Sequence, residues 1–221
     1  MAYDLNDIRT RVRAKIKDSS YAAANIDGFI DDAQMEIADL HPWSYFQKSV
    51  SGALTIGEYT YELQDDHQTT ERLILIHPTN ANSYWNLTKK YLPEDEFYSR
   101  FPAPGSQDNS QPYYWTEYGN QRYFNCPVDL TYTLRTYYRK VPTELSGDSA
   151  VPELPRNFRE ALVLGAAYRC EEERDNYDIA AVLQNRFNDK VSDLITRLAN
   201  TTSVGPDTII GGPTGLDDWS K

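Results

Sequence analysis

Apolar side chains in residues 154–200 recur at steps of three and four, which predicts two helices separated by a short polar break. The first half begins after Pro155, a residue favoured at helix starts, and contains the small residues Gly165, Ala166 and Ala167, which let a second backbone come close. The sequence leaves open whether these small residues pack within the subunit or against a neighbouring copy. In the second half, one helical face carries a run of large apolar residues: Leu183, Phe187, Val191, Leu194 and Leu198.

Two further amphipathic helices are predicted near the N-terminus. Over residues 4–17, Asp4 is available as the N-cap and one face is apolar. Residues 26–40 keep the same period until Pro42, which cannot continue a helix. Helices of this length are marginal in water on their own, so we expect both to pack against the helices at 155–199.

Between these helical segments, the chain changes to short β-rich runs separated by turn residues. The clearest strand is 130–140, where Leu130, Tyr132, Leu134, Thr136 and Tyr138 alternate with a second set of side chains. Gly119-Asn120, between two aromatic runs, predicts a hairpin with a two-residue turn. A short helix is expected over 92–97, with Pro93 at its first position.

Together these patterns predict an α+β fold. The N- and C-terminal helices form a bundle, and an antiparallel β module, sandwich-like or barrel-like, is inserted between them. The predicted parts are an N-terminal helical pair at 1–42, the β module at 43–141, a linker containing several prolines at 142–155, C-terminal helices at 156–200 and an extended arm at 201–221.

The C-terminal segment combines Gly and Pro at short intervals with a set of apolar residues: Val204, Ile209, Ile210, Leu216 and Trp219. Disordered tails are usually poorer in such anchors. We therefore interpret 201–221 as an arm that becomes ordered on a partner surface. The alternative is a frayed terminus.

The charge balance argues against a protein that grips nucleic acid. The chain has 33 acidic and 22 basic residues, for a formal net charge of −11, and so offers no general attraction to DNA or to an anionic membrane. An acidic surface is compatible with a conduit past which DNA slides without binding, because phosphate is repelled. Neither a signal peptide nor a membrane span is expected, which favours a cytoplasm-like compartment.

Candidate catalytic or metal-binding chemistry is sparse. Cys126 and Cys170 are interpreted as buried, reduced thiols, because two cysteines in a chain of this size make no disulfide framework. Asp65-Asp66-His67 is the one cluster with a metal-ligand composition, and a solvated turn is the favoured interpretation. No nucleophile-elbow, Walker or dinucleotide motif occurs, and no further His, Cys or carboxylate recurs at metal-ligand spacing, so we expect no cofactor or metal.

Aromatic residues are abundant, with 17 Tyr, 4 Trp and 7 Phe, and they concentrate between Trp43 and Tyr138. Tyr and Trp suit surfaces that are dry on one side and wet on the other. The excess therefore indicates an assembly interface or a stacking platform for sugar rings, whereas an ordinary β-sheet core is the simpler alternative.

The chain as a whole resembles the head-to-tail adaptor proteins of tailed bacteriophages, also called connector or gatekeeper proteins, which include the tail tubular A-like proteins. The resemblance rests on IDGFIDDAQMEIADLHPW at the end of the paired N-terminal helices, on LTYTLRTYYRKVPTEL at the end of the Tyr-rich module, and on VPELPRNFREALVLGAAYRC followed by NRFNDKVSDLITRLAN. These motifs cover nearly the whole chain.

This resemblance implies a non-enzymatic virion protein at the neck, assembled in the host cytoplasm. Copies of the chain would form a ring, usually of twelve, between the portal protein and the tail or nozzle protein. The helical bundle would form the wall of the ring, and DNA would pass through without specific binding. The arm at 201–221 would dock on the portal.

Two other functions remain open from the sequence. A carbohydrate-binding or tail-fibre-type β module would use the exposed Tyr and Trp, but it gives the flanking helices no role. A hydrolase could use a pair of carboxylates that only the fold brings together.

Overall fold

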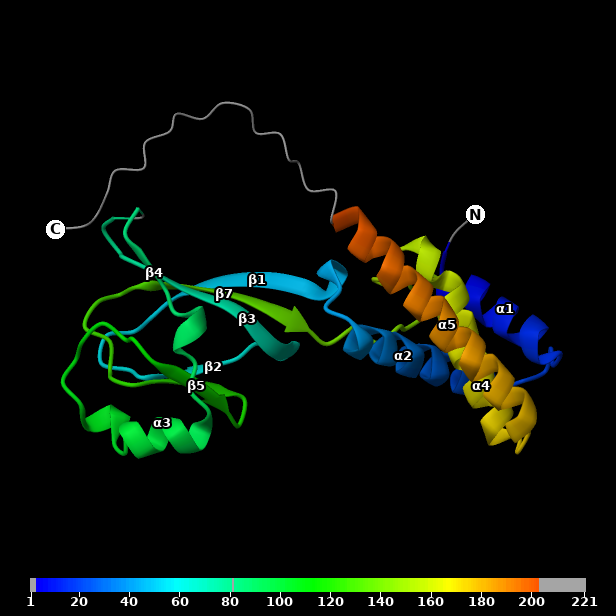
Figure 1. Ribbon diagram of the computed structural model, residues 1–221, viewed down its shortest axis with the longest axis horizontal. Helices are drawn as coiled ribbons and strands as arrows, with labels where there is room; N and C mark the ends of the chain where they lie inside the picture. Colours follow the sequence, from blue (N-terminus) through cyan, green and yellow to red (C-terminus); the bar gives the residue numbers. More distant parts are fainter. Residues whose placement is uncertain (1–2, 81, 203–221) are drawn as a thin grey trace, which may run out of the picture. The chain divides into compact units, whose positions relative to one another are not determined.

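The computed structural model describes residues 3–80 and 82–202, with side chains described as far as 197, and it shows the predicted α+β fold (Figure 1). The helices are α1 (Leu5–Ile16), α2 (Ala23–Leu40), α3 (Glu94–Arg100), α4 (Arg159–Glu173) and α5 (Tyr177–Thr202). The strands are β1 (Gln47–Ala53), β2 (Thr60–Glu62), β3 (His67–Ile76), β4 (Tyr84–Asn86), β5 (Trp115–Tyr118), β6 (Gln121–Phe124) and β7 (Thr133–Lys140). The chain divides into a helical unit, up to Ala33 and from Leu145 onward, and a β unit at Gln34–Glu144.

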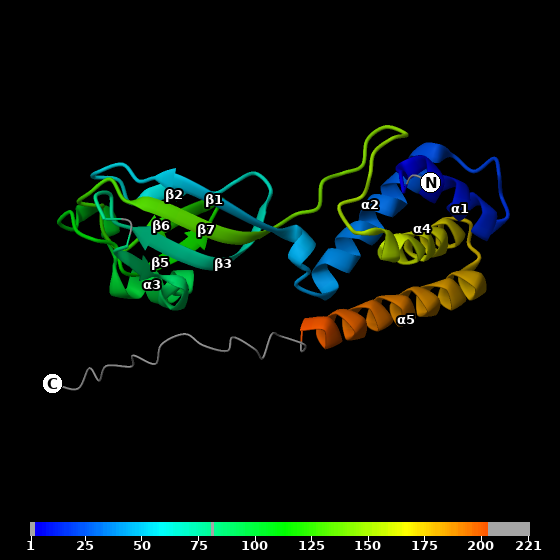
Figure 2. The same cartoon turned by 90° about the horizontal axis from the view of Figure 1, so that it is seen from above.

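In the helical unit, α4 lies between α1 and α5 (Figure 2). As predicted, Asp4 caps α1: its carboxylate accepts a hydrogen bond of 2.8 Å from the Asp7 amide. The apolar face of α1 is fully buried at Leu5 and Ile8. Apolar burial of this kind supplies the stability that the short helices lack on their own.

The segment just before α4 is tied to the N-terminal end of α1. The amide of Leu5 donates to the Ala150 carbonyl at 2.8 Å, and the Arg9 guanidinium contacts Asp148 at 2.8 Å and Asp27 at 2.8 Å. Arg9 is nearly buried, so these two carboxylates satisfy a cation that water reaches poorly. Residues 145–155 are therefore held by the helical unit although they have no regular structure.

The β unit contains two antiparallel sheets, with strand orders β1-β7-β3-β4 and β2-β6-β5. Strand β7 pairs with both β1 and β3 and shows the predicted alternation, with Leu134, Thr136 and Tyr138 buried and Arg135 exposed. The core of the unit consists of the buried residues Leu54, Leu73, Leu75, Leu87, Trp115, Phe124, Val128, Tyr132 and Leu134.

Several predicted boundaries shift in the structure. Strand β7 begins at Thr133, and Leu130, at its predicted start, is 38% exposed. Pro93 caps α3 from one position outside the helix. A 3₁₀ turn at Arg156–Phe158 precedes α4, and α5 continues through Thr202, two residues into the segment predicted as the arm. The predicted hairpin is confirmed, because Gly119 and Asn120 both have positive φ, at 57° and 62°.

Candidate functional site

The predicted small residues of α4 lie inside the helical unit. A Cβ atom at Gly165 would be 2.6 Å from the Cβ of Ala33 on α2 and 3.1 Å from the ring of Phe187 on α5. Ala166 and Ala167 are fully buried. The structure therefore places these residues where helix backbones approach each other within one subunit.

The predicted apolar stripe of α5 faces the same interior. Leu183, Phe187, Val191 and Leu194 are all buried, and the Phe187 ring lies 5.9 Å from that of Tyr168 on α4. The side chain of Leu198 is outside the described residues, as are the predicted arm residues Val204, Ile209, Ile210, Leu216 and Trp219. Since this face of α5 is used within the subunit, a contact with a neighbour must use another face of the helix.

The turn between α4 and α5 is fixed by a buried carboxylate. Glu171 is only 3% exposed, and its Oε2 accepts a hydrogen bond of 2.6 Å from the Asn176 side chain. Its Oε1 accepts one of 3.2 Å from Arg174. Asp175 completes the turn with φ at 58°. The polar stretch after Cys170 is thus a structured turn in which Glu171 is a core residue.

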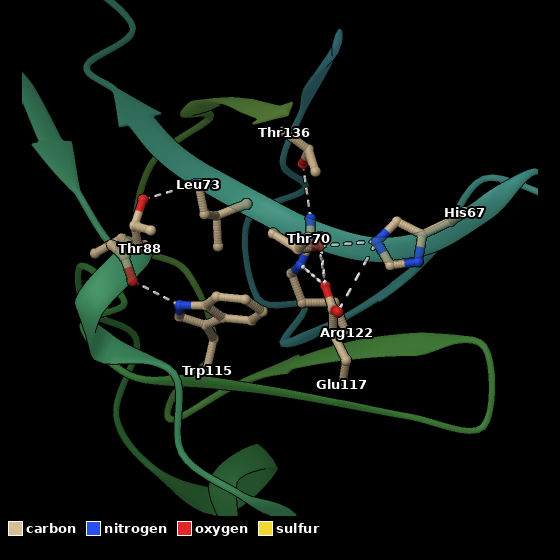
Figure 3. A network of polar contacts seen from close by, with 9 residues as sticks. His67, Thr70, Leu73, Thr88, Trp115, Glu117, Arg122 and Thr136 are labelled. Atoms are coloured by element: carbon tan, nitrogen blue, oxygen red, sulfur yellow. Dashed lines mark hydrogen bonds and ion pairs between the residues drawn. The ribbon is translucent and has the colours of Figure 1, made fainter. Parts of the chain in front are cut away.

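A buried polar network in the β unit was not predicted (Figure 3). At its centre, the Arg122 guanidinium on β6 donates to Glu117 Oε1 on β5 at 3.0 Å, to Thr136 Oγ1 on β7 at 2.8 Å and to Thr70 Oγ1 on β3 at 2.9 Å. Arg122 is 4% exposed. The network therefore joins strands of both sheets through one cation whose charge is matched by one carboxylate.

His67 completes this network and its tautomer follows from the contacts. The Thr70 hydroxyl donates its hydrogen to Glu117 Oε1 at 2.7 Å and accepts from Arg122, so the His67 Nε2, 2.8 Å away, must also be a donor. Burial lowers the pKa of His67, and the nearby Arg122 charge acts in the same direction, while Glu117 and Asp66 oppose them. The imidazole is therefore held in its neutral form near pH 7.

Cavities adjoin the network. A cavity of about 130 Å³ is lined by His67, Arg122 and Thr136, among others. A more open groove is lined by His67, Thr70 and Glu117, together with Trp115, whose indole nitrogen donates to the Leu87 carbonyl at 2.7 Å. Because Glu117 already accepts from Arg122 and Thr70, it is poorly placed as a general base. The arrangement is best suited to holding the two sheets in register.

The predicted solvated turn is confirmed for Asp65, which is exposed within a turn, but it is wrong for His67. Its side chain is 6% exposed and begins β3, while the neighbouring Asp66 accepts from Lys48 at 2.8 Å and Tyr138 at 2.7 Å. The sequence did contain a signal for the buried network: Thr70 and Thr136 are polar residues at core-facing strand positions, and buried hydroxyls require hydrogen-bond partners. Among residues 3–80 and 82–202, no group of three His, Cys, Asp or Glu side chains could hold a metal ion.

The aromatic residues of the β unit divide between the core and the surface. Trp115, Phe124, Tyr132 and Tyr138 are buried, whereas Tyr84, Tyr91, Tyr113 and Tyr118 are exposed by 45% or more. Tyr91 and Tyr118 flank the open groove beside the network, and Tyr118 stacks on Tyr123 with ring centroids 5.5 Å apart. Part of the aromatic excess is therefore core, and part is available to a partner.

Cys126 and Cys170 are both buried free thiols, and burial raises the pKa of each. Within the described ranges, no helix combines the length and the apolar character needed to cross a membrane.

A model of the SU10 adaptor protein family matches residues 3–209 of the chain. A search of curated proteins found no significant match.

Proposed function

Because the chain belongs to the SU10 adaptor protein family, a family of bacteriophage head-to-tail adaptors found at the virion neck, we propose that it forms the adaptor ring that joins the portal to the tail or nozzle protein and lines the DNA conduit. The family match, which extends over both structural units, carries this proposal. The ring would contain twelve copies and act without catalysis or a cofactor.

Features of the chain support each part of this role. The helical unit has its own apolar core and can serve as a rigid wall segment. A net charge of −11 suits a conduit, because DNA passing along an acidic surface is repelled and not retained. The β unit, held by the Arg122 network, can present its exposed tyrosines to a tail or nozzle protein.

We assign portal docking to the segment that follows α5. Its apolar residues Val204, Ile209, Ile210, Leu216 and Trp219 would supply the anchors. Truncation after Thr202 leaves α5 complete and should abolish attachment to the portal while the remainder still folds. A control chain in which 203–221 is replaced by a Gly/Ser segment of equal length should also fail, because length alone supplies no anchor.

Electron microscopy of the full chain with its portal protein tests the proposal. A closed ring between portal and tail is the expected result, with truncated chains absent from the complex. A full chain that remains monomeric both alone and with the portal would refute the ring. A chain that is monomeric only in the absence of the portal would not refute the ring, since some adaptors assemble only on a template.

A second candidate function is glycan binding by the β unit. The observation in its favour is that the exposed Tyr91 and Tyr118 flank an open groove also lined by Gln68 and Asn120, a combination of aromatic and amide groups that suits sugars. A glycan array probed with the full chain tests this function, and binding that survives Tyr118→Ala would count against the groove.

A further inference from the structure

One face of α5 has apolar side chains that the described residues of the helical unit leave exposed. Ile179 and Val182 are 53% and 52% exposed and lie three residues apart, so they occupy the same side of the helix. This side borders the buried stripe that includes Leu183 and Phe187, because Ile179 lies one turn before Leu183 and Val182 is rotated by about 100° from it. An apolar face of this kind on a virion protein indicates a protein contact.

The apolar pair is accompanied by carboxylates without cationic partners. Asp178 belongs to the first turn of α5 and Asp175 to the preceding turn, and neither makes an ion pair with any described residue. The Tyr177 hydroxyl donates a hydrogen bond of 2.8 Å to Asp175, and this bond does not neutralise the Asp175 carboxylate. Arg186 follows one turn after Val182, and Asp189 lies three residues further along the helix. The N-terminal part of this face is therefore apolar and acidic.

The outer face of α1 has the opposite charge and is hollowed. The exposed residues Thr10, Ala14 and Lys17 recur at helical spacing and, with Arg13, line a shallow hollow of about 490 Å³. Arg13 donates to the Tyr21 carbonyl at 2.9 Å, and within the described ranges neither it nor Lys17 pairs with a carboxylate.

Asp18 is the acidic residue at the edge of this hollow. Its carboxylate accepts from the Ser20 amide at 2.9 Å and the Ser20 hydroxyl at 2.7 Å, and it lies 4.0 Å from Arg174. Asp18 is therefore already engaged within its own subunit. The free charges around the hollow are those of Arg13 and Lys17.

The two helices that carry these faces, α1 and α5, lie on opposite sides of α4 (Figure 2). When the α5 face of one copy contacts the α1 face of the next, the first copy still has a free α1 face and the second copy still has a free α5 face. Such a head-to-tail contact can repeat, and it forms a closed ring when the rotation between copies closes.

We infer that the α5 face of one copy binds the α1 face of the next, with Ile179 and Val182 seated in the hollow around Ala14. Asp175 and Asp178 then lie opposite Arg13 and Lys17 of the neighbouring copy. The opposite charges orient the approach and disfavour α5–α5 and α1–α1 pairing. This contact rests on the proposed function, because it supplies the lateral interface of the adaptor ring.

Disulfide trapping in the full chain tests the contact. Ala14→Cys and Val182→Cys place exposed thiols on the two faces, while the natural Cys126 and Cys170 are buried. In rings assembled on the portal, oxidation should give a ladder of covalent oligomers on a non-reducing gel. Fixed neighbours raise the effective thiol concentration, so we expect about tenfold more product than from a control pair, Ala14→Cys with Gln184→Cys, which places the second thiol on another exposed side of α5.

Charge reversal provides a second measurement. Asp178→Lys should reduce ring formation on the portal, and Lys17→Glu in the same chain should restore it, because both residues are exposed and their charges exchange across the contact. Two results would overturn the interface and leave the adaptor function standing. Either rings form without a disulfide between Ala14→Cys and Val182→Cys, or the control pair forms disulfides to the same extent. If no ring forms even on the portal, the adaptor function is overturned together with the interface.

Discussion

Gly165 on α4 and Ala33 on α2 approach so closely that a Cβ atom at Gly165 would be 2.6 Å from the Ala33 Cβ. Neither atom can move by changing a side-chain rotamer, because each is fixed to a helix backbone. The ring of Phe187, at 3.1 Å, blocks the other direction. The spacing of these helices is therefore set by the absence of a side chain at Gly165.

Gly165→Ala should destabilise the helical unit by about 1–3 kcal/mol through overpacking. The direction of this change in stability is informative, because Gly→Ala within a helix ordinarily stabilises by about 0.5–1 kcal/mol. Gly28→Ala on α2 is the matched control: a Cβ there meets no atom within 4 Å, so this change should stabilise. Denaturant unfolding of both variants measures the difference, and Ala33→Gly should partly rescue Gly165→Ala.

The Arg122–Glu117 pair leads to a second prediction, in the β unit. Arg122→Met leaves Glu117 without its cation and Thr70 and Thr136 without their donor, and should lower the free energy of unfolding by about 3 kcal/mol or more. Arg122→Met combined with Glu117→Gln should cost less than the sum of the two single changes, because no uncompensated charge remains. Arg135→Met, at an exposed position on β7, should stay within about 0.5 kcal/mol of the parent protein.

His67 makes the stability of the β unit depend on pH. Because its pKa is lowered in the folded state, the unfolded chain binds more protons once the pH falls below about 6.5. The free energy of unfolding should therefore decrease as the pH falls from 7 towards 5, before most carboxylates titrate.

Urea midpoints measured at several pH values would show this slope. His67→Gln should flatten it, since an amide can still donate to Thr70 but does not titrate in this range. His41→Gln, at a residue outside the network, controls for the general effect of losing a histidine. A slope unchanged by His67→Gln would assign the pH dependence to other groups.

Periodicity was sufficient to predict the helices and the clearest strand. The apolar residues of α1 and the run from Leu183 to Leu194 on α5 are buried as their spacing requires, and β7 alternates as its sequence does. Pro93 and Gly119-Asn120 marked local starts and turns through backbone chemistry that acts without tertiary contacts.

The polar network could not be predicted from periodicity. Arg122, Thr136 and the pair His67 and Thr70 come from three different strands, β6, β7 and β3, and only the pairing and stacking of the sheets brings them together. Periodicity reports which side of a strand faces the core but not which residues meet across it. Likewise, the spacing of Gly165 predicted close packing, while only the fold identified Ala33 and Phe187 as its neighbours.

Each unit contains one buried thiol, which permits a final test of how the units unfold. Cys170 is fully buried in the helical unit, where burial raises its pKa to about 11, and Cys126 is buried in the β unit. Both thiols should react slowly with a thiol reagent at pH 8, because attack requires an exposed thiolate. When reclosing is faster than labelling, the labelling rate follows the population of the open state, so a loss of about 1.4 kcal/mol speeds labelling about tenfold.

Gly165→Ala should therefore accelerate labelling of Cys170 and leave Cys126 unchanged, whereas Arg122→Met should do the reverse. The reason is that each unit has its own buried core, so opening one need not expose the other. Mass spectrometry of labelled peptides resolves the two sites, and labelling in concentrated guanidinium gives the rate for fully exposed thiols. Equal acceleration of both thiols by either substitution would instead mean that the two units unfold as a single cooperative block.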